Sequence, residues 1–394
     1  DAQARLIAGV RYEMDQQQFS SYNNLYTFAS QVDVETVSLV EERSSQMPGV
    51  TITVDNVRQY DTTYASHVLG RVGKIYREEY EELKDQDYGL NDTIGKDGLE
   101  KAYESYLRGI DGEKAVETNI NGDVINETET KEPQPGSNVI LTLDLDLRAV
   151  AEASLASTIQ SIKERGQRNH SSGWDVEGGA AVVIDIDTGG ILACASYPTY
   201  NLATFNQDYQ MLYDDPLKPM FNRAIMGAYP PGSTFKPAVA VAALDSGLIN
   251  QYSTVNCTGV YTYYKDYRPR CTQHGHRGNI SVVDAIKWSC NIFFYDVGRR
   301  LTSDVYDAYA YKLGLAQRTG VEVSESLGRL TTKNDSNYNT SLDIQAAIGQ
   351  GNTVVTPIQL ATYAATLANN GVRYRTHFVK AILDTNTGEV IHET

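Results

Sequence analysis

The sequence predicts an α+β protein, in which a domain of helices and antiparallel strands follows an elongated, mixed α/β pedestal domain. The first ~135 residues, with the usual uncertainty of element boundaries, are polar and rich in turn formers. A Pro- and Gly-rich stretch follows, and then a strand, a helix, a strand hairpin and further helices come in order. We therefore expect two domains, residues 1–137 and 138–394.

The pedestal domain carries two recognisable patterns before its linker. Residues 49–60, GVTITVDNVRQY, alternate apolar and polar side chains, which predicts a strand. Residues 98–113 place apolar side chains on one helical face before Gly109 ends the helix. The prolines of residues 131–138, KEPQPGSN, forbid regular structure and indicate a linker.

The second domain begins with a β-branched strand and a long helix over residues 139–166, where apolar residues recur at helical spacing. Residues 178–198 predict two buried strands, because apolar β-formers flank the Gly-rich turn DTGG.

The end of the chain predicts a helix and a hairpin. In residues 356–371 Thr356 can cap the first amides, Pro357 suits the first turn, and an Asn-Gly pair supplies a left-handed stop. Residues 377–394 resemble a strand hairpin.

The composition excludes some classes of function. A formal charge of -16 and a pI near 4.8 argue against a nucleic-acid partner, because phosphate binding depends on Lys and Arg clusters. No apolar run is long enough to span a membrane, and there is no signal peptide. We expect a chain trimmed of its membrane anchor to have this same appearance.

Ser233 is a candidate nucleophile because it precedes Lys236 by three residues at the start of a predicted helix. Residues three apart share a helical face, so the amine lies within reach of the hydroxyl. A lysine can take the serine proton if burial lowers its pKa toward neutrality. Serine is also a preferred helix cap, and a Ser-x-x-Lys match is expected by chance about once in such a chain, so an ordinary cap is the alternative.

Ser289 and Asn291 form a second candidate motif, Ser-x-Asn, about 55 residues further along. If the backbone there is extended, both side chains point the same way and Cys290 points the other way. Ser289 could then relay a proton to or from the first pair, while Asn291 holds a substrate amide. Local hydrogen bonding in a turn is the alternative.

The two motifs, in this order and at this spacing, resemble the serine acyltransferases that include penicillin-binding proteins and class A β-lactamases. The surrounding segments are similar to class B penicillin-binding proteins, and the resemblance covers nearly the whole chain. It rests on ASHVLGRVG, GLEKAYESYLRGIDGE, GGAAVVIDIDTGGILACASYPTYN, FNRAIMGAYPPGSTFKP and AIGQGNTVVTPIQLATYAATLANNG. The segment SSQMPGVTITVDNVRQY and the cysteine spacing make it most like the elongation-type members of Gram-positive bacteria.

This resemblance implies a membrane-anchored peptidoglycan D,D-transpeptidase, on the outer face of the cell membrane, which acts in cell-wall elongation and cell shape. Ser233 would attack the D-Ala-D-Ala end of a stem peptide, Lys236 would be the general base, Ser289 the relay and Asn291 an amide contact. β-Lactams would acylate Ser233, no cofactor would take part in catalysis, and a membrane glycosyltransferase would be a partner.

The family's third signature, Lys-Thr-Gly, is absent from this sequence. The resemblance places it on a later strand that forms one wall of the cleft and half of the oxyanion hole. We therefore expect a transpeptidase domain that lacks its C-terminal part, and weak or absent acylation of this exact polypeptide.

A structural zinc site is predicted from Cys257, Cys271 and Cys290 with His276 as the preferred fourth ligand and His274 in reserve, because three thiols and an imidazole suffice for closed tetrahedral zinc. The alternative is a disulfide between Cys257 and Cys271.

Two other functions compete with transpeptidation. The first is a β-lactamase or β-lactam sensor, which the long pedestal and the absence of a deacylating glutamate motif disfavour. The second is a non-catalytic scaffold or activator of a membrane glycosyltransferase. The intact Ser-x-x-Lys and Ser-x-Asn motifs argue against it.

Overall fold

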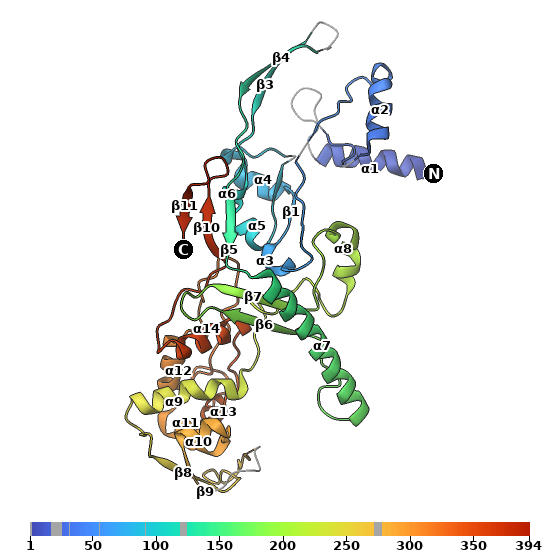
Figure 1. Ribbon diagram of the computed structural model, residues 1–394. Helices are drawn as coiled ribbons and strands as arrows, with labels where there is room; N and C mark the ends of the chain where they lie inside the picture. Colours follow the sequence, from blue (N-terminus) through green and yellow to red (C-terminus); the bar gives the residue numbers. More distant parts are fainter. Residues whose placement is uncertain are drawn as a thin grey trace. The chain divides into compact units, whose positions relative to one another are not determined.

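The computed structural model describes residues 2–16, 26–30, 32–54, 56–90, 92–118, 124–271 and 278–394, which are drawn in colour in Figure 1. These residues fall into two compact units. Unit 1 covers residues 1–61 and 70–104, and unit 2 covers residues 62–69 and 105–394. The predicted domain boundary after residue 137 stays a prediction, because the boundaries of the two compact units fall at other residues.

Unit 1 has a small core around one antiparallel strand pair, β1 with β2. Ile75, Tyr88 and Ile94 form this core, against which Tyr80 and Leu83 pack. The elements of unit 1 are α1 (Ala2–Gln16), α2 (Val34–Glu42), η1 (Ser44–Gln46), β1 (Val72–Lys74), α4 (Arg77–Leu83), η2 (Lys84–Gln86), β2 (Thr93–Gly95) and α5 (Gly98–Ala102).

Two details of the pedestal differ from the prediction. The described residues of 49–60 pair with no strand, and Val54 is fully exposed, because alternation supplies two faces but a strand also needs a neighbour for its backbone hydrogen bonds. The helix predicted within 98–113 is interrupted at Tyr103, whose φ of -115° is not helical.

Unit 2 holds the remaining elements and most of the buried core. They are α3 (Ser66–Leu69), α6 (Glu104–Leu107), β3 (Glu113–Thr118), β4 (Val124–Lys131), β5 (Asn138–Leu141), α7 (Leu145–Asn169), β6 (Gly179–Ile184), β7 (Ile191–Tyr197), α8 (Phe205–Asp214), η3 (Gly232–Phe235), α9 (Lys236–Asp245), β8 (Thr254–Cys257), β9 (Gly278–Ser281), α10 (Val282–Lys287), α11 (Asn291–Leu301), α12 (Ser303–Lys312), α13 (Thr340–Ala346), α14 (Pro357–Ala368), β10 (Val379–Leu383) and β11 (Val390–Glu393).

The strands described in unit 2 are all antiparallel to their neighbours. The order β11-β10-β5 joins the predicted C-terminal hairpin to the strand that opens the second domain. The predicted pair β6 and β7 turns at Asp185, whose carboxylate accepts from the Asp187 amide. Helix α7 packs on β7 and helix α14 on β6. These elements confirm the predicted α+β arrangement.

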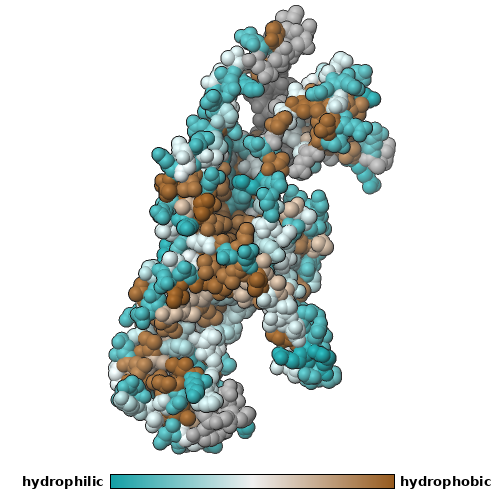
Figure 2. Space-filling view, in the orientation of Figure 1, coloured by the Kyte–Doolittle hydropathy of each residue, from teal (hydrophilic) through white to brown (hydrophobic). Residues whose placement is uncertain are grey.

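Helix α14 begins at its predicted cap, Thr356, and helix α7 begins at a cap that was not predicted, Asp144. Thr356 and Gln359 form a reciprocal capping box at the start of α14, and Asn370, with φ of 48°, follows its end in the left-handed region. Asp144 caps α7 by accepting from the Leu147 amide. Figure 2 shows mostly hydrophilic surface at the far end of α7, which agrees with the polar sequence there.

The main core of unit 2 surrounds α9 and α11. Helix α9 buries a row of small residues, and α11 and α12 pack against it. Small side chains let these helices approach closely, so the first residues of α9 and α11 are held near one another. No helix in the described ranges is both long and apolar enough to cross a membrane.

A short segment from the N-terminal part of the chain is built into unit 2. Residues 62–69 include α3, in which the Ser66 hydroxyl donates to the Tyr200 carbonyl. The His67 ring donates from Nε2 to the Pro219 carbonyl at 2.6 Å. Residues 65–68 are buried, and Ser66 is 1 % exposed, so this part of the segment is internal to the unit rather than a linker on its surface.

Candidate active site

Ser233 lies on a tight turn that leads into α9. The turn η3 begins at Gly232, whose φ of 57° lies in the left-handed region. Ser233 is exposed, whereas Phe235 and Lys236, two and three positions further on, are buried, at 0 % and 2 % exposed. The 3₁₀ turn therefore presents the hydroxyl outward while it sends the lysine side chain into the protein.

Lys236 makes three hydrogen bonds that use all of its ammonium protons. Its Nζ donates to Ser289 Oγ at 2.9 Å, to the Ser289 carbonyl at 3.0 Å and to Asn291 Oδ1 at 2.6 Å. The first two contacts hold Ser289 through both its backbone and its side chain. The two sequence motifs are thus joined through the lysine.

The nucleophile connects to the lysine through Ser289. The Ser289 hydroxyl donates to Ser233 Oγ at 2.9 Å. The Lys236 amide donates to the Ser233 carbonyl, but among the described residues no hydrogen bond joins Lys236 Nζ to Ser233 Oγ. The sequence predicted a direct approach from helical spacing, but the 3₁₀ turn places Ser233 and Lys236 differently from two residues of one α-helix.

Burial gives Lys236 the properties of a base. Loss of solvation lowers the pKa of Lys236 to about 8, and the thiols of Cys271 and Cys290 raise it in part. At a pKa near 8 about a tenth of the lysine is neutral at pH 7. Neutral lysine has a free lone pair, so it can accept a proton from the serine pair.

The Ser289 backbone is not extended, although the predicted arrangement of side chains holds. Ser289 follows α10 in the left-handed region, with φ of 51°, and its amide donates to Ile286 while the Cys290 amide donates to Ala285. This is a helix-ending turn of the Schellman type, in which glycine is the usual residue. Ser289 and Asn291 both face Lys236, and Cys290 faces away from it toward other thiols.

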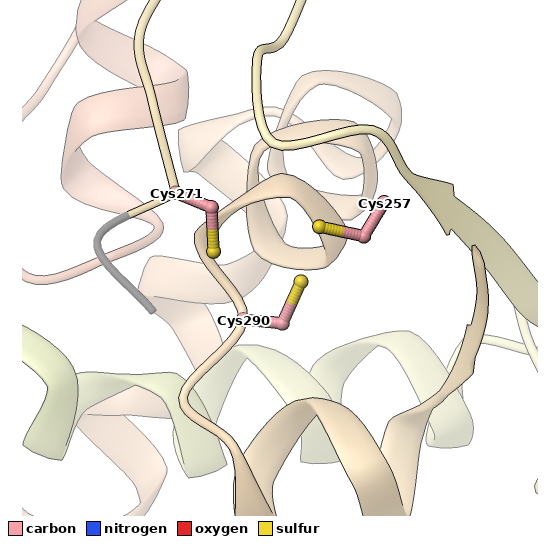
Figure 3. A group of neighbouring side chains, drawn as sticks. All are labelled: Cys257, Cys271 and Cys290. Carbon is pink, nitrogen blue, oxygen red and sulfur yellow. The ribbon is translucent and has the colours of Figure 1, made fainter. Parts of the chain in front are cut away.

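Three thiols converge behind this turn. Figure 3 shows the side chains of Cys257, Cys271 and Cys290 pointing toward one another, and their sulfur atoms all lie within 4.8 Å. They are 1 %, 5 % and 0 % exposed. No disulfide joins any of the four cysteines, all of which the structure describes, so the alternative disulfide between Cys257 and Cys271 is not formed in this structure.

The thiol group fits part of a tetrahedral metal site. Zinc binds thiolate sulfur, and sulfur atoms around one centre at this mutual distance suit three of its four ligands. The predicted fourth ligand, His276, and the reserve, His274, lie outside the described residues. Cys194 is not part of this group: it lies in β7, is 2 % exposed and packs in the core.

The sequence did not lead us to predict one contact of the nucleophile turn, the turn Gly232–Phe235 that carries Ser233. The Gly232 amide donates to the Gly349 carbonyl at 2.8 Å, so the segment after α13 lies against the turn. The paired glycines of AIGQGN were a usable signal, because glycine marks positions that need a positive φ or a close backbone approach.

The chain matches two family models. Residues 179–394 match the penicillin binding protein transpeptidase domain, and residues 4–141 match the penicillin-binding protein dimerisation domain.

Curated relatives agree with these matches. The peptidoglycan D,D-transpeptidase MrdA of Acinetobacter baumannii is 31% identical over 88% of this chain and 51% of its own length. Penicillin-binding protein 2B of Streptococcus pneumoniae is 26% identical over 93% of this chain and 55% of its own length. The chain therefore spans about half the length of the curated relatives it matches.

A solved structure titled "Structural coordination of polymerization and crosslinking by a peptidoglycan synthase complex" superposes with a TM-score of 0.74 at 29% identity, over 98% of this chain and 69% of the other. This likeness confirms the predicted transpeptidase fold with its N-terminal pedestal. The chain belongs to the penicillin-binding protein transpeptidase family, in the class B group whose members carry an N-terminal dimerisation domain.

Proposed function

We propose that the chain carries the acylating centre of a peptidoglycan D,D-transpeptidase, with Ser233 as the nucleophile. The observation that carries this proposal is the hydrogen-bonded path from Ser233 through Ser289 to a buried lysine with a pKa near 8. Such a path supplies both a poised hydroxyl and a base, which are the two requirements of serine acyl transfer.

The acylation step moves one proton along this path. Ser233 Oγ attacks the carbonyl carbon of the penultimate D-alanine and gives its proton to Ser289 Oγ, which gives its own proton to neutral Lys236. The protonated path returns a proton to the departing amine of D-alanine as the peptide bond breaks. Attack by an amine of a second stem peptide then releases Ser233 and completes the cross-link.

Asn291 supports this step from beside the lysine. Because an ammonium has no acceptor, the Asn291 oxygen must face Lys236, and the amide nitrogen is left to donate elsewhere. The amide nitrogen has two N–H groups, of which one faces the Tyr295 hydroxyl, and we assign the other to the carbonyl of the substrate peptide.

The relatives support the substrate and setting. They are named peptidoglycan D,D-transpeptidase and penicillin-binding protein, so stem peptides ending in D-Ala-D-Ala and β-lactams are the proposed ligands. Cell-wall elongation at the outer face of the cell membrane is the proposed setting. A membrane glycosyltransferase is the proposed partner, since the solved relative is described as coordinating polymerization with crosslinking.

The test is covalent labelling by a fluorescent penicillin, measured in the longest form of the protein that contains this chain. We expect one label per chain at Ser233, identified by peptide mass, and none in Ser233→Ala. A matched control is Ser246→Ala, which removes another serine near the end of α9. Labelling that persists in Ser233→Ala would assign the nucleophile elsewhere, and growth supported by Ser233→Ala would favour the scaffold function.

We propose also that Cys257, Cys271 and Cys290 hold a structural zinc ion, with His276 as the predicted fourth ligand. The role of the ion would be structural rather than catalytic, because a zinc ion with four protein ligands has no open position for a substrate. Cys290 lies between Ser289 and Asn291, so a fixed sulfur would brace the relay turn from behind.

Metal analysis of the purified protein tests this second proposal. We expect about one equivalent of zinc, which Cys290→Ser and Cys257→Ser lower and the buried control Cys194→Ser does not. Less than a tenth of an equivalent of zinc, together with the loss of two free thiols, would instead establish the disulfide.

A further inference from the structure

The nucleophile turn is held by a second segment that takes no part in the proton path. This support rests on Gly349, which stands in the sequence Gly349-Gln350-Gly351 just after α13. The Gly232 amide donates to the Gly349 carbonyl at 2.8 Å, so the residue before the nucleophile is tied to this segment.

The contact is too close for any side chain. A Cβ at Gly349 would lie 2.1 Å from the Gly232 oxygen and 2.7 Å from its nitrogen. Both are backbone atoms, which cannot swing aside as the end of a flexible side chain can. The turn that carries Ser233 would therefore have to move.

Gly349 also ends α13, and this alone is an ordinary reason for glycine. Its amide donates to Ala346 and the Gln350 amide to Gln345, as in a Schellman motif, and its φ is 71°. Helix termination does not account for the contact with Gly232. The same residue thus sets the end of one helix and the position of a turn elsewhere in the chain.

A second point fixes the approach to the turn. Tyr229 and Val355 exchange both of their backbone hydrogen bonds at 2.9 Å. The stretch from Gly349 to Val355 therefore contacts the chain on both sides of the Pro-Pro pair that precedes the nucleophile. Two anchors set both the place and the orientation of the turn.

We propose that Gly349 is a positioning residue for Ser233, which holds the nucleophile turn at the place where Ser233 Oγ meets the Ser289 hydroxyl. This inference rests on the proposed acylation by Ser233. A displacement of about 1 Å can cost about a hundredfold in rate, since reaction requires close alignment of the attacking atom.

Gly351 provides a matched control. Its φ of 72° equals that of Gly349 within a degree, so Gly351→Ala introduces the same left-handed strain. A Cβ there meets only Leu342 and Thr331 side-chain atoms at 3.4 Å and the Ala346 nitrogen at 3.9 Å, which are ordinary contacts. The two alanine variants differ in whether they displace the turn.

The first experiment compares acylation by a fluorescent penicillin in Gly349→Ala and Gly351→Ala. We expect the rate constant at saturating penicillin to fall about a hundredfold in Gly349→Ala and less than threefold in Gly351→Ala. The concentration for half saturation should change little, because the turn positions the attacking atom. Equal rate constants in the two variants would overturn the proposal.

Hydrogen exchange supplies a readout that does not depend on acylation. In the unmodified protein we expect the Gly232 amide to be protected as strongly as core amides of α9, which requires no variant to fold. In Gly349→Ala the Gly232 amide should exchange faster, and in Gly351→Ala it should not. Rapid exchange of the Gly232 amide in the unmodified protein would refute the proposal that Gly349 holds the turn. If the Gly232 amide is protected but the unmodified protein is not acylated, only the proposed function would be refuted.

Discussion

The pKa of Lys236 makes a quantitative prediction about the pH dependence of acylation. Burial lowers this pKa to about 8, so the fraction of neutral lysine is about one-tenth at pH 7, one-half at pH 8 and nine-tenths at pH 9. If neutral Lys236 is the base, the acylation rate constant should rise about tenfold between pH 7 and pH 9 and then level off.

The assay is the rate of fluorescent-penicillin labelling at saturating reagent, measured from pH 6 to pH 9.5. Lys236→Arg tests the same base by substitution, because a guanidinium stays protonated throughout this range. We expect its rate constant to fall at least a hundredfold, as is common when a general base is removed.

Lys287→Arg is the matched control, since Lys287 is an exposed lysine in α10, two residues before Ser289. A rate constant that is flat between pH 7 and pH 9 would refute the assignment of Lys236 as the base. So would a Lys236→Arg variant that acylates within threefold of the unmodified protein.

Three further predictions concern stability, each measured by chemical denaturation. Burial and neighbouring acidic groups raise the pKa of Asp307 to about 8, whereas the carboxyl of the unfolded chain ionises near pH 4. The free energy of unfolding therefore falls as pH rises from 4 to 8. Asp307→Asn should restore about 3–5 kcal/mol of it at pH 8 but only about 1–2 kcal/mol at pH 5. Equal gains at both pH values would contradict this. Glu152→Gln should cost about 3–5 kcal/mol, because Arg148 is fully buried and would lose its carboxylate partner; a loss below 1 kcal/mol would contradict it. Thr356→Ala should cost about 1 kcal/mol through loss of the capping box on α14, and an unchanged stability would show that the cap is redundant.

Local signals in the sequence predicted the elements of the second domain well. The capped helix after Thr356, the strand pair around the DTGG turn and the C-terminal hairpin all form, since each has both its own pattern and its own stop signals. In the pedestal the alternation of residues 49–60 failed, because pairing with a neighbouring strand is a property of the fold and not of the segment.

The sequence predicted which residues form the site better than it predicted how those residues are arranged. The motifs led to four residues that the structure brings together around Lys236. Helical spacing gave the wrong route between Ser233 and Lys236, because a 3₁₀ turn separates them and only the tertiary contact with Ser289 completes the path. The left-handed backbone of Ser289 could not be predicted either, since nothing in the sequence marks a serine as the end of α10.

The segment 62–69 has a consequence for dividing the protein into parts. Because it lies inside unit 2 while the residues on both sides of it belong to unit 1, the transpeptidase unit is not one continuous stretch of polypeptide. A fragment that starts at residue 138 would lack the donors that now satisfy the Tyr200 and Pro219 carbonyls, and would open the interior that Ser66 and His67 fill. Adding residues 62–69 as a separate peptide should restore the fold of such a fragment, so that the fragment and the peptide together unfold as one cooperative unit.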